Sequence, residues 1–75
     1  MMTTTDERQT LADFAEVGGW HRRNVDRTDY YSKGGARVQV IWTGTAAISG
    51  GSLYHDDVLT AYTRDLRTIQ GWLRR

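Results

Sequence analysis

The sequence predicts an α+β fold in the order helix, three-stranded antiparallel meander, helix, with both helices on one sheet face. Three observations lead to this fold class. A helix-capping pattern near the N-terminus precedes a pair of glycines, polar and apolar residues alternate over positions 37–43, and apolar residues recur every three or four positions over residues 56–75. Because consecutive strands usually pair and one sheet face must be covered, both helices are expected on the same face.

The first helix is expected to begin at Thr4, because Thr4 and Glu7 have the spacing of a capping box. Leu11 and Phe14 supply its short apolar face. The helix is expected to end at the Gly18–Gly19 pair, since glycine readily adopts the left-handed conformation that closes a helix.

Alternation predicts the central strand of the meander at residues 37–43, with Val38, Val40 and Trp42 on one face and polar residues on the other, where only Ile41 interrupts the pattern. Residues 33–35 contain two glycines and form a hairpin turn, so a strand that ends near residues 30–32 becomes the antiparallel partner. Residues 48–54 can form a third strand, which two internal glycines weaken.

The second helix is expected over residues 56–75, capped by Asp56 or Asp57. Its apolar residues form one stripe, which consists of Leu59, Tyr62, Leu66, Ile69 and Leu73. Leu66 is the middle member of this stripe, and it is therefore expected at the centre of the core.

Length and composition predict a single domain over residues 1–75, with residues 1–3 as a disordered tail. The chain contains no cysteine, so neither a disulfide nor a zinc thiolate can support so small a core. It also lacks an apolar run of membrane-spanning length and the residue order of a signal peptide. These features predict a soluble cytoplasmic protein that does not bind membranes.

The positions of the charged residues say more about a possible binding partner than the net charge does. Ten Lys and Arg residues against nine Asp and Glu residues give a formal net charge of only +1, whereas dedicated nucleic-acid binders are usually more basic. Most of the positive residues gather at positions 22–37 and 64–75, and nearly all are Arg, which can bind carboxylate or phosphate and stack on aromatic rings. A solvated surface explains the same pattern, so both interpretations stay open.

The sequence offers little support for catalysis. Its one cluster of His and carboxylates is His55, Asp56 and Asp57, but three adjacent side chains diverge, and helix capping explains both aspartates. The glycine-containing segment 49–52 lacks the Gly-Lys-Ser/Thr ending of a phosphate-binding loop. We therefore predict a protein that is not an enzyme and that holds no metal or cofactor.

The order helix, three strands, helix is also that of the double-stranded-RNA-binding domain. That family places a basic cluster at the start of its second helix, where it contacts phosphates. This chain has Asp56 and Asp57 at that position, and carboxylates would repel phosphate there. The shared topology therefore does not by itself indicate that this chain binds double-stranded RNA.

A second resemblance covers residues 37–73. The segments 40–44, 49–57 and 62–66 resemble small orphan proteins encoded by actinobacterial bacteriophages. The resemblance implies a phage protein that works in the cytoplasm of a host cell. It implies no particular activity, since that group has none assigned.

Three Trp, four Tyr and one Phe are many aromatic residues for so short a chain. Trp42, Tyr62 and Phe14 are expected core members, whereas Trp20, Trp72 and one of Tyr30 and Tyr31 are expected at the edge of the core or outside it. Tyr, Trp and Arg are also enriched at interface hot spots, although bulky rings can equally complete a thin core.

The candidate binding residues combine the Arg-rich middle of the chain with the sheet face that the helices leave uncovered. They are Arg22, Arg23, Arg27, Tyr30, Tyr31, Arg37, Gln39 and Ile41. We expect a binding protein that contacts a host or phage protein. We also expect a homodimer formed through the uncovered sheet face or a sheet edge. The alternative is a nucleic-acid-binding protein that uses the same Arg and Tyr residues.

Overall fold

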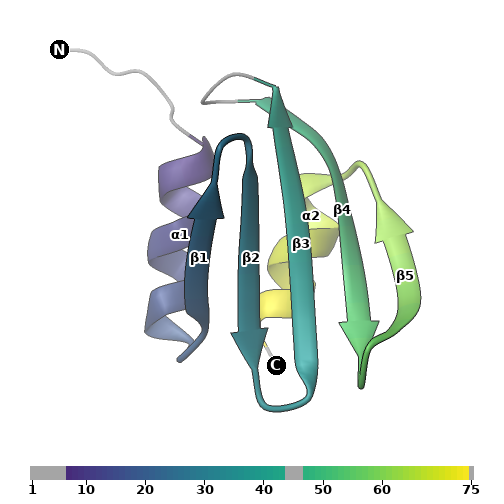
Figure 1. The fold of residues 1–75 in the computed structure, drawn as a ribbon. Coiled ribbons are helices and arrows are strands. Elements are labelled where there is room, and N and C mark those ends of the chain that lie inside the picture. The colour runs from purple at the N-terminus through teal and green to yellow at the C-terminus, as the bar shows by residue number, and fades with distance from the viewer. Residues whose placement is uncertain (1–6, 44–46, 75) are drawn as a thin grey trace, which may run out of the picture.

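The computed structural model describes residues 7–43 and 47–74. Helix α1 (Glu7–Val17) begins the described fold and helix α2 (Leu66–Leu73) ends it. Between them lie the strands β1 (His21–Val25), β2 (Thr28–Lys33), β3 (Ala36–Thr43), β4 (Ala47–His55) and β5 (Val58–Thr63). The strands form one antiparallel sheet in the order β1-β2-β3-β4-β5 (Figure 1). The α+β class and the meander are confirmed, but the expectation of three strands is wrong.

Strand β1 is the first element that the sequence pattern did not predict. All five of its residues are exposed, so its sequence shows no alternation of apolar and polar residues. It nevertheless pairs with β2 along its whole length, from His21 opposite Ser32 to Val25 opposite Thr28. Asp26, with a φ of 52°, provides the left-handed backbone that closes this hairpin with a two-residue turn.

Strand β5 is the second such element, and it replaces the first half of the expected second helix. Asp56 and Asp57 have φ angles of 51° and 67°, and they form the turn between β4 and β5 instead of a helix cap. Leu59 and Tyr62 are 55% and 62% exposed, so they do not belong to an apolar stripe that faces the core. Of the described part of the expected second helix, residues 56–74, only residues 66–73 are helical.

A β-bulge explains why strand β5 has helix-like apolar spacing. The pairing of β5 with β4 skips Thr60, which is the extra residue of the bulge. The Thr60 hydroxyl donates a hydrogen bond of 3.1 Å to the carbonyl oxygen of Leu53. As a result, Leu59 and Tyr62 face the same side of the sheet although they are three residues apart, a spacing otherwise typical of a helix.

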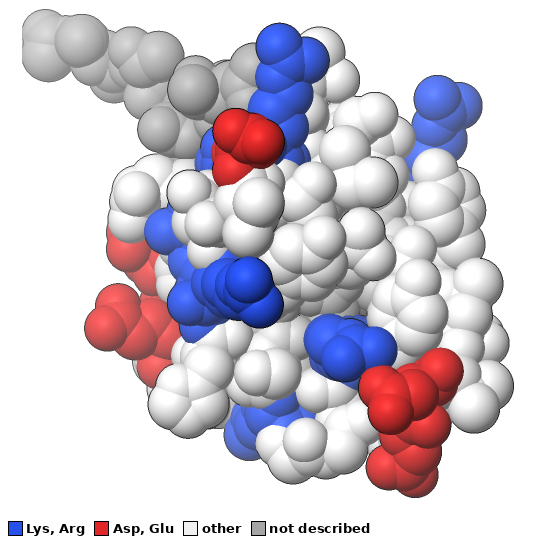
Figure 2. All heavy atoms as spheres, in the orientation of Figure 1, with Lys and Arg blue, Asp and Glu red and all other residues white. Residues whose placement is uncertain are grey.

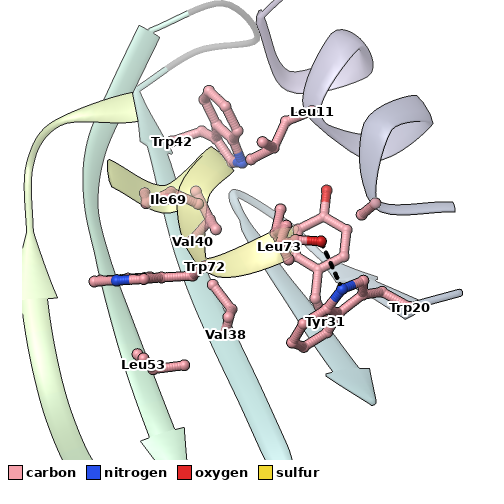
Figure 3. Packing of buried hydrophobic residues seen from close by; sticks show 11 residues of the cluster. Leu11, Trp20, Tyr31, Val38, Val40, Trp42, Leu53, Ile69, Trp72 and Leu73 are labelled. Carbon is pink, nitrogen blue, oxygen red and sulfur yellow. Dashed lines mark hydrogen bonds between the residues drawn. The ribbon is translucent and has the colours of Figure 1, made fainter. Parts of the chain in front are cut away.

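The core lies between the two helices and the sheet face that they cover, and both helices lie behind the sheet in Figure 1. Its buried members are Leu11, Ala15, Trp20, Tyr31, Val38, Val40, Trp42, Leu53, Ile69, Trp72 and Leu73 (Figure 3). Trp42 is confirmed as a core residue, and Phe14 packs against the cluster while partly buried. Tyr62 was wrongly expected inside. Trp20 and Trp72, expected at the edge, are buried.

Ile69, and not Leu66, occupies the centre of the core contributed by α2. Ile69 has no exposed surface, whereas Leu66 is partly buried and packs against the margin of the cluster. The Ile69 side chain lies against Gly51 of β4, where a Cβ atom would collide with its Cδ1 and Cγ1 atoms. On the opposite sheet face, a Cβ on Gly50 would lie 2.6 Å from the hydroxyl oxygen of Tyr62. The absence of a Cβ at Gly51 and at Gly50 thus lets the side chains of Ile69 and Tyr62 lie directly against the backbone of β4.

Helix α1 ends at the predicted glycine pair. Gly19 has a φ of 86°, and the backbone N–H of Trp20 donates a 3.0 Å hydrogen bond back to Ala15, as in a Schellman motif. The indole N–H of Trp20 then donates to the carbonyl oxygen of Leu73 at 2.9 Å, which joins the ends of the two helices (Figure 3). The predicted cap Thr4 and the predicted tail at residues 1–3 lie outside the described residues.

Tyr31 introduces a polar atom into the core. The side chain is fully buried, and within the described residues its hydroxyl has no hydrogen-bond partner. Burial, followed by the nearby charge of Asp29, raises the pKa of Tyr31 from 10.0 to about 12. The fold therefore favours the neutral phenol. This contribution to stability is complete below pH 10 and is lost as the pH rises through about 12.

We expect Tyr31→Phe to leave the free energy of unfolding unchanged or to raise it by up to about 1–3 kcal/mol, because it removes a buried hydroxyl without a partner. The variant should also lose less stability than the parent between pH 10 and pH 12. Denaturant unfolding at pH 8 and pH 11 measures both effects. Tyr30→Phe, on the uncovered sheet face, is the matched control. A variant clearly less stable at pH 8 would mean that the hydroxyl has a partner.

Candidate functional site

The candidate site is the sheet face opposite the helices, which we call the open face. Strand pairing arranges its side chains in three rows across the sheet. The first row is His21, Ser32, Arg37, Tyr54 and Leu59, the second is Arg23, Tyr30, Gln39, Ser52 and Tyr62, and the third is Val25, Thr28 and Ile41. No described helix covers these rows.

A shallow hollow of about 650 Å³ lies on the part of the open face formed by β1 to β4. Its lining combines basic, aromatic and small polar side chains: His21, Arg22, Arg23, Val25, Tyr30, Ser32, Arg37, Gln39 and Tyr54. The small side chain of Ser32 stands between His21 and Arg37 in the first row, which leaves room there.

Arg37 is held in place on the open face by two neighbours. Its guanidinium donates a 2.9 Å hydrogen bond to Asp57, and it lies 5.4 Å from the centroid of the Tyr54 ring. Such an exposed ion pair contributes little to stability, but together with the cation–π contact it orients the guanidinium over the ring. Arg37 and Tyr54 therefore form one ordered surface on the open face.

Charges on the open face are sparse. In Figure 2 the Lys and Arg side chains are separated by uncharged side chains, and the acidic side chains lie around the margin, at the corner below β4 and β5, at the left edge and at the top. Arg23, next to Tyr30 in the second row, forms no ion pair within the described residues. Most of the open face is therefore uncharged.

The structure brings together five of the eight residues that the sequence proposed for binding. These are Arg23, Tyr30, Arg37, Gln39 and Ile41, all on the open face. Arg27 is exposed in the turn between β1 and β2, at the end of the sheet.

The other two proposed binding residues, Arg22 and Tyr31, belong to the opposite side of the sheet. Successive strand residues face opposite sides, so Tyr31 points into the core while Tyr30 points outward. A fully buried Tyr31 cannot contact a partner. The expectation that Tyr31 lies on the uncovered sheet face is therefore wrong. Arg22 lies on the edge strand, where it lines the margin of the hollow and donates a 3.2 Å hydrogen bond to Asp29 on the helix side.

Sequence reasoning missed the part of the open face that the β4–β5 hairpin contributes. Leu59 and Tyr62 were assigned to a helix, and Tyr54 was not considered a surface residue. The available signal was the Asp56-Asp57 pair, since two adjacent residues that tolerate positive φ suit a two-residue hairpin turn. His21 and Val25 were missed together with strand β1.

A second polar cluster surrounds Asp29 on the helix side of the sheet. This carboxylate has no exposed surface and accepts hydrogen bonds from Arg8 at 2.9 and 3.0 Å, Arg22 at 3.2 Å, Asn24 at 2.9 Å and the Trp42 indole at 3.1 Å. Burial alone would raise the pKa of Asp29, but the hydrogen bonds and the charges of the arginines outweigh it and lower the pKa below 3.8. With its oxygens occupied, Asp29 anchors α1 to the sheet and does not form an open site.

The cluster His55, Asp56 and Asp57, weighed above as a candidate for chemistry, lies at the exposed β4–β5 turn. Asp57 accepts the hydrogen bond from Arg37, and the two aspartates shape the turn through their positive φ angles. Across residues 7–43 and 47–74, no group of three or more His, Cys, Asp or Glu side chains is arranged to hold a metal ion. The structure thus gives these residues a turn-forming role.

Comparison of the chain with protein-family models, with curated proteins and with solved structures found no significant match. Neither described helix is long and apolar enough to span a lipid bilayer. The function must therefore be inferred from the geometry of the open face.

Proposed function

We propose that this protein is a non-enzymatic binding protein whose open face contacts another protein. The supporting observation is a five-stranded sheet whose uncovered face combines Tyr and Arg with exposed apolar side chains. Val25 and Ile41 are each 42% exposed, and Leu59 and Tyr62 are more so. Tyr and Arg around an apolar centre are typical of protein interfaces. Following the phage resemblance, the partner would be a host or phage protein in the host cytoplasm.

The sparse charge of the open face favours a protein partner over a nucleic acid. Phosphate binding draws its affinity from several cations, but Arg37 is already paired with Asp57. That leaves Arg23 and the neighbouring His21 on this face. The exposed apolar surface of Ile41 gives phosphates nothing to bind.

A nucleic-acid partner remains the second candidate because of one juxtaposition. Arg23 stands beside Tyr30, and Arg37 lies over Tyr54, so each cation accompanies a ring on which a base could stack. On this alternative, binding would weaken steeply as salt rises, because counterions are released from the phosphates. A contact dominated by apolar side chains would weaken far less.

We expect Ile41→Lys to reduce affinity for the partner at least about tenfold, because it places a charge near the middle of the open face. The measurement is affinity capture from host lysate, with and without nuclease, followed by titration of the captured partner. Val17→Lys is the matched control, because Val17 is 90% exposed on α1, away from the open face.

A protein partner should survive nuclease, bind the Val17→Lys variant and be lost from Ile41→Lys. Capture abolished by nuclease, together with loss of binding in Arg23→Glu, would favour the nucleic-acid alternative instead. Undiminished binding by Ile41→Lys would show that a different surface is used.

A further inference from the structure

We propose that two copies of this protein pair antiparallel along strand β5 and form one continuous sheet. Strand β5 is the rim of the sheet, and no described element lies beyond it (Figure 1). It pairs only with β4, so within the described residues its outward backbone groups have no partner. Unpaired backbone groups of this kind are a template for another strand.

The opposite edge of the sheet is better protected against strand addition than β5 is. Strand β1 carries the charged residues Arg22 and Arg23, and α1 packs against it. Strand β5 contains neither a charge nor a proline in its sequence Val58–Thr63, and its side chains Val58, Leu59 and Tyr62 are exposed. Charged residues, prolines and bulges are the usual means of preventing strand addition, and of these β5 has only the bulge at Thr60. Pairing is therefore expected at β5 and not at β1.

A second copy in antiparallel orientation fits this edge, because the side chains of β5 are self-complementary under a two-fold axis. Asp56 and Asp57 precede the strand, and Arg64 and Asp65 follow it. A two-fold axis through the middle of β5 would bring Asp57 of each copy near Arg64 of the other and Asp56 near Asp65, so that one opposite-charge pair offsets one like-charge pair. Parallel pairing would instead place like charges together at both ends of the strand, which is destabilising.

The bulge gives this pairing a matching side-chain contact. When two antiparallel β5 strands are centred on one another, Leu59 of each copy lies opposite Tyr62 of the other. Both side chains lie on the open face, because the bulge at Thr60 places them there. Aromatic and aliphatic residues on opposite strands form favourable pairs. The bulge also interrupts the outer ladder, so the interface is small and a weak, concentration-dependent dimer is expected.

A two-fold axis perpendicular to the sheet keeps all four helices on one side. The two open faces then join into one surface across the dimer. This pairing does not depend on which molecule binds the open face, so it can be tested with the purified protein alone.

We expect sedimentation equilibrium at micromolar concentrations to show a monomer–dimer equilibrium. Leu59→Lys should raise the dissociation constant at least about tenfold, because two-fold symmetry repeats the lost contact. Arg64→Glu should also weaken the dimer. Ile41→Lys, on the open face away from β5, and Arg27→Glu, in the β1–β2 turn, are the matched controls and should remain dimeric. Circular dichroism confirms that each variant is folded.

The chain has no cysteine, so introduced thiols report the register directly. A mixture of Leu59→Cys and Tyr62→Cys proteins should form disulfide-linked dimers faster than either protein alone, since facing strand residues lie within disulfide reach. A monomer mass for the parent at all concentrations would refute the proposal. So would a dimer that dissociates in Ile41→Lys and persists in Leu59→Lys, because the contact would then be face to face.

Discussion

Asp29→Ala is expected to lower the free energy of unfolding by about 3–5 kcal/mol, because it removes one partner of a buried ion pair. Arg8 would lose both of its hydrogen bonds to the carboxylate, and the buried indole N–H of Trp42 would lose its acceptor. The Arg8 side chain is only 14% exposed, so water replaces little of what is lost. Urea denaturation at neutral pH measures the effect.

Asp13→Ala, at an exposed position on α1, is the matched control and should change stability by less than about 1 kcal/mol. Acid titration adds a second test. The pKa of Asp29 is lowered in the fold, so its contribution is present above the ordinary value of 3.8 and is lost as the pH falls through the lower folded pKa. The variant should lose this part of the acid dependence. A small loss of stability at neutral pH would show that α1 does not depend on this carboxylate.

Ile69→Ala is expected to lower the free energy of unfolding by about 2–5 kcal/mol, because it opens a cavity at the centre of the core. Ile69 is fully buried against Gly51, and the glycine has no side chain that could fill the space. For a domain of this length, such a loss lowers the melting temperature by at least about 8 °C. Thermal denaturation followed by circular dichroism measures it.

Leu66→Ala is the matched comparison on the same helix. Leu66 is only partly buried at the margin of the core, so a smaller loss than for Ile69→Ala is expected. This reverses the order that the apolar stripe alone predicts, in which Leu66 lies at the centre. A larger loss for Leu66→Ala would mean that α2 packs in a different rotation.

The sequence predicted the elements whose local pattern agrees with their position in the fold. Residues 37–43 alternate because β3 is covered on one face only, and Gly19 at the end of α1 has the left-handed conformation that the sequence predicted. Strand β1 could not be predicted in this way, since none of its side chains is buried. Its pairing with β2 comes from backbone hydrogen bonds, which leave no hydrophobic periodicity.

The candidate site was predicted in part for the same reason. Gln39 and Ile41 followed from the alternation of β3, but Leu59 and Tyr62 required knowledge of the bulge at Thr60. The pair Asp56-Asp57 suits both a helix cap and a hairpin turn, so the residues themselves do not decide between them. The decision comes from the strand pairing of β5 with β4, a tertiary contact.

The hydrogen bond between Trp20 and Leu73 joins two segments that lie far apart in the chain. Every strand pairs with its neighbour in the chain, so most connections close short loops at a small loss of chain entropy. The Trp20–Leu73 contact spans 53 residues and encloses the whole sheet. We therefore expect the hairpins to form early through local contacts, which favour rapid folding, and α2 to dock beside α1 afterwards. The contact between the two helix ends is thus expected late in the formation of this domain.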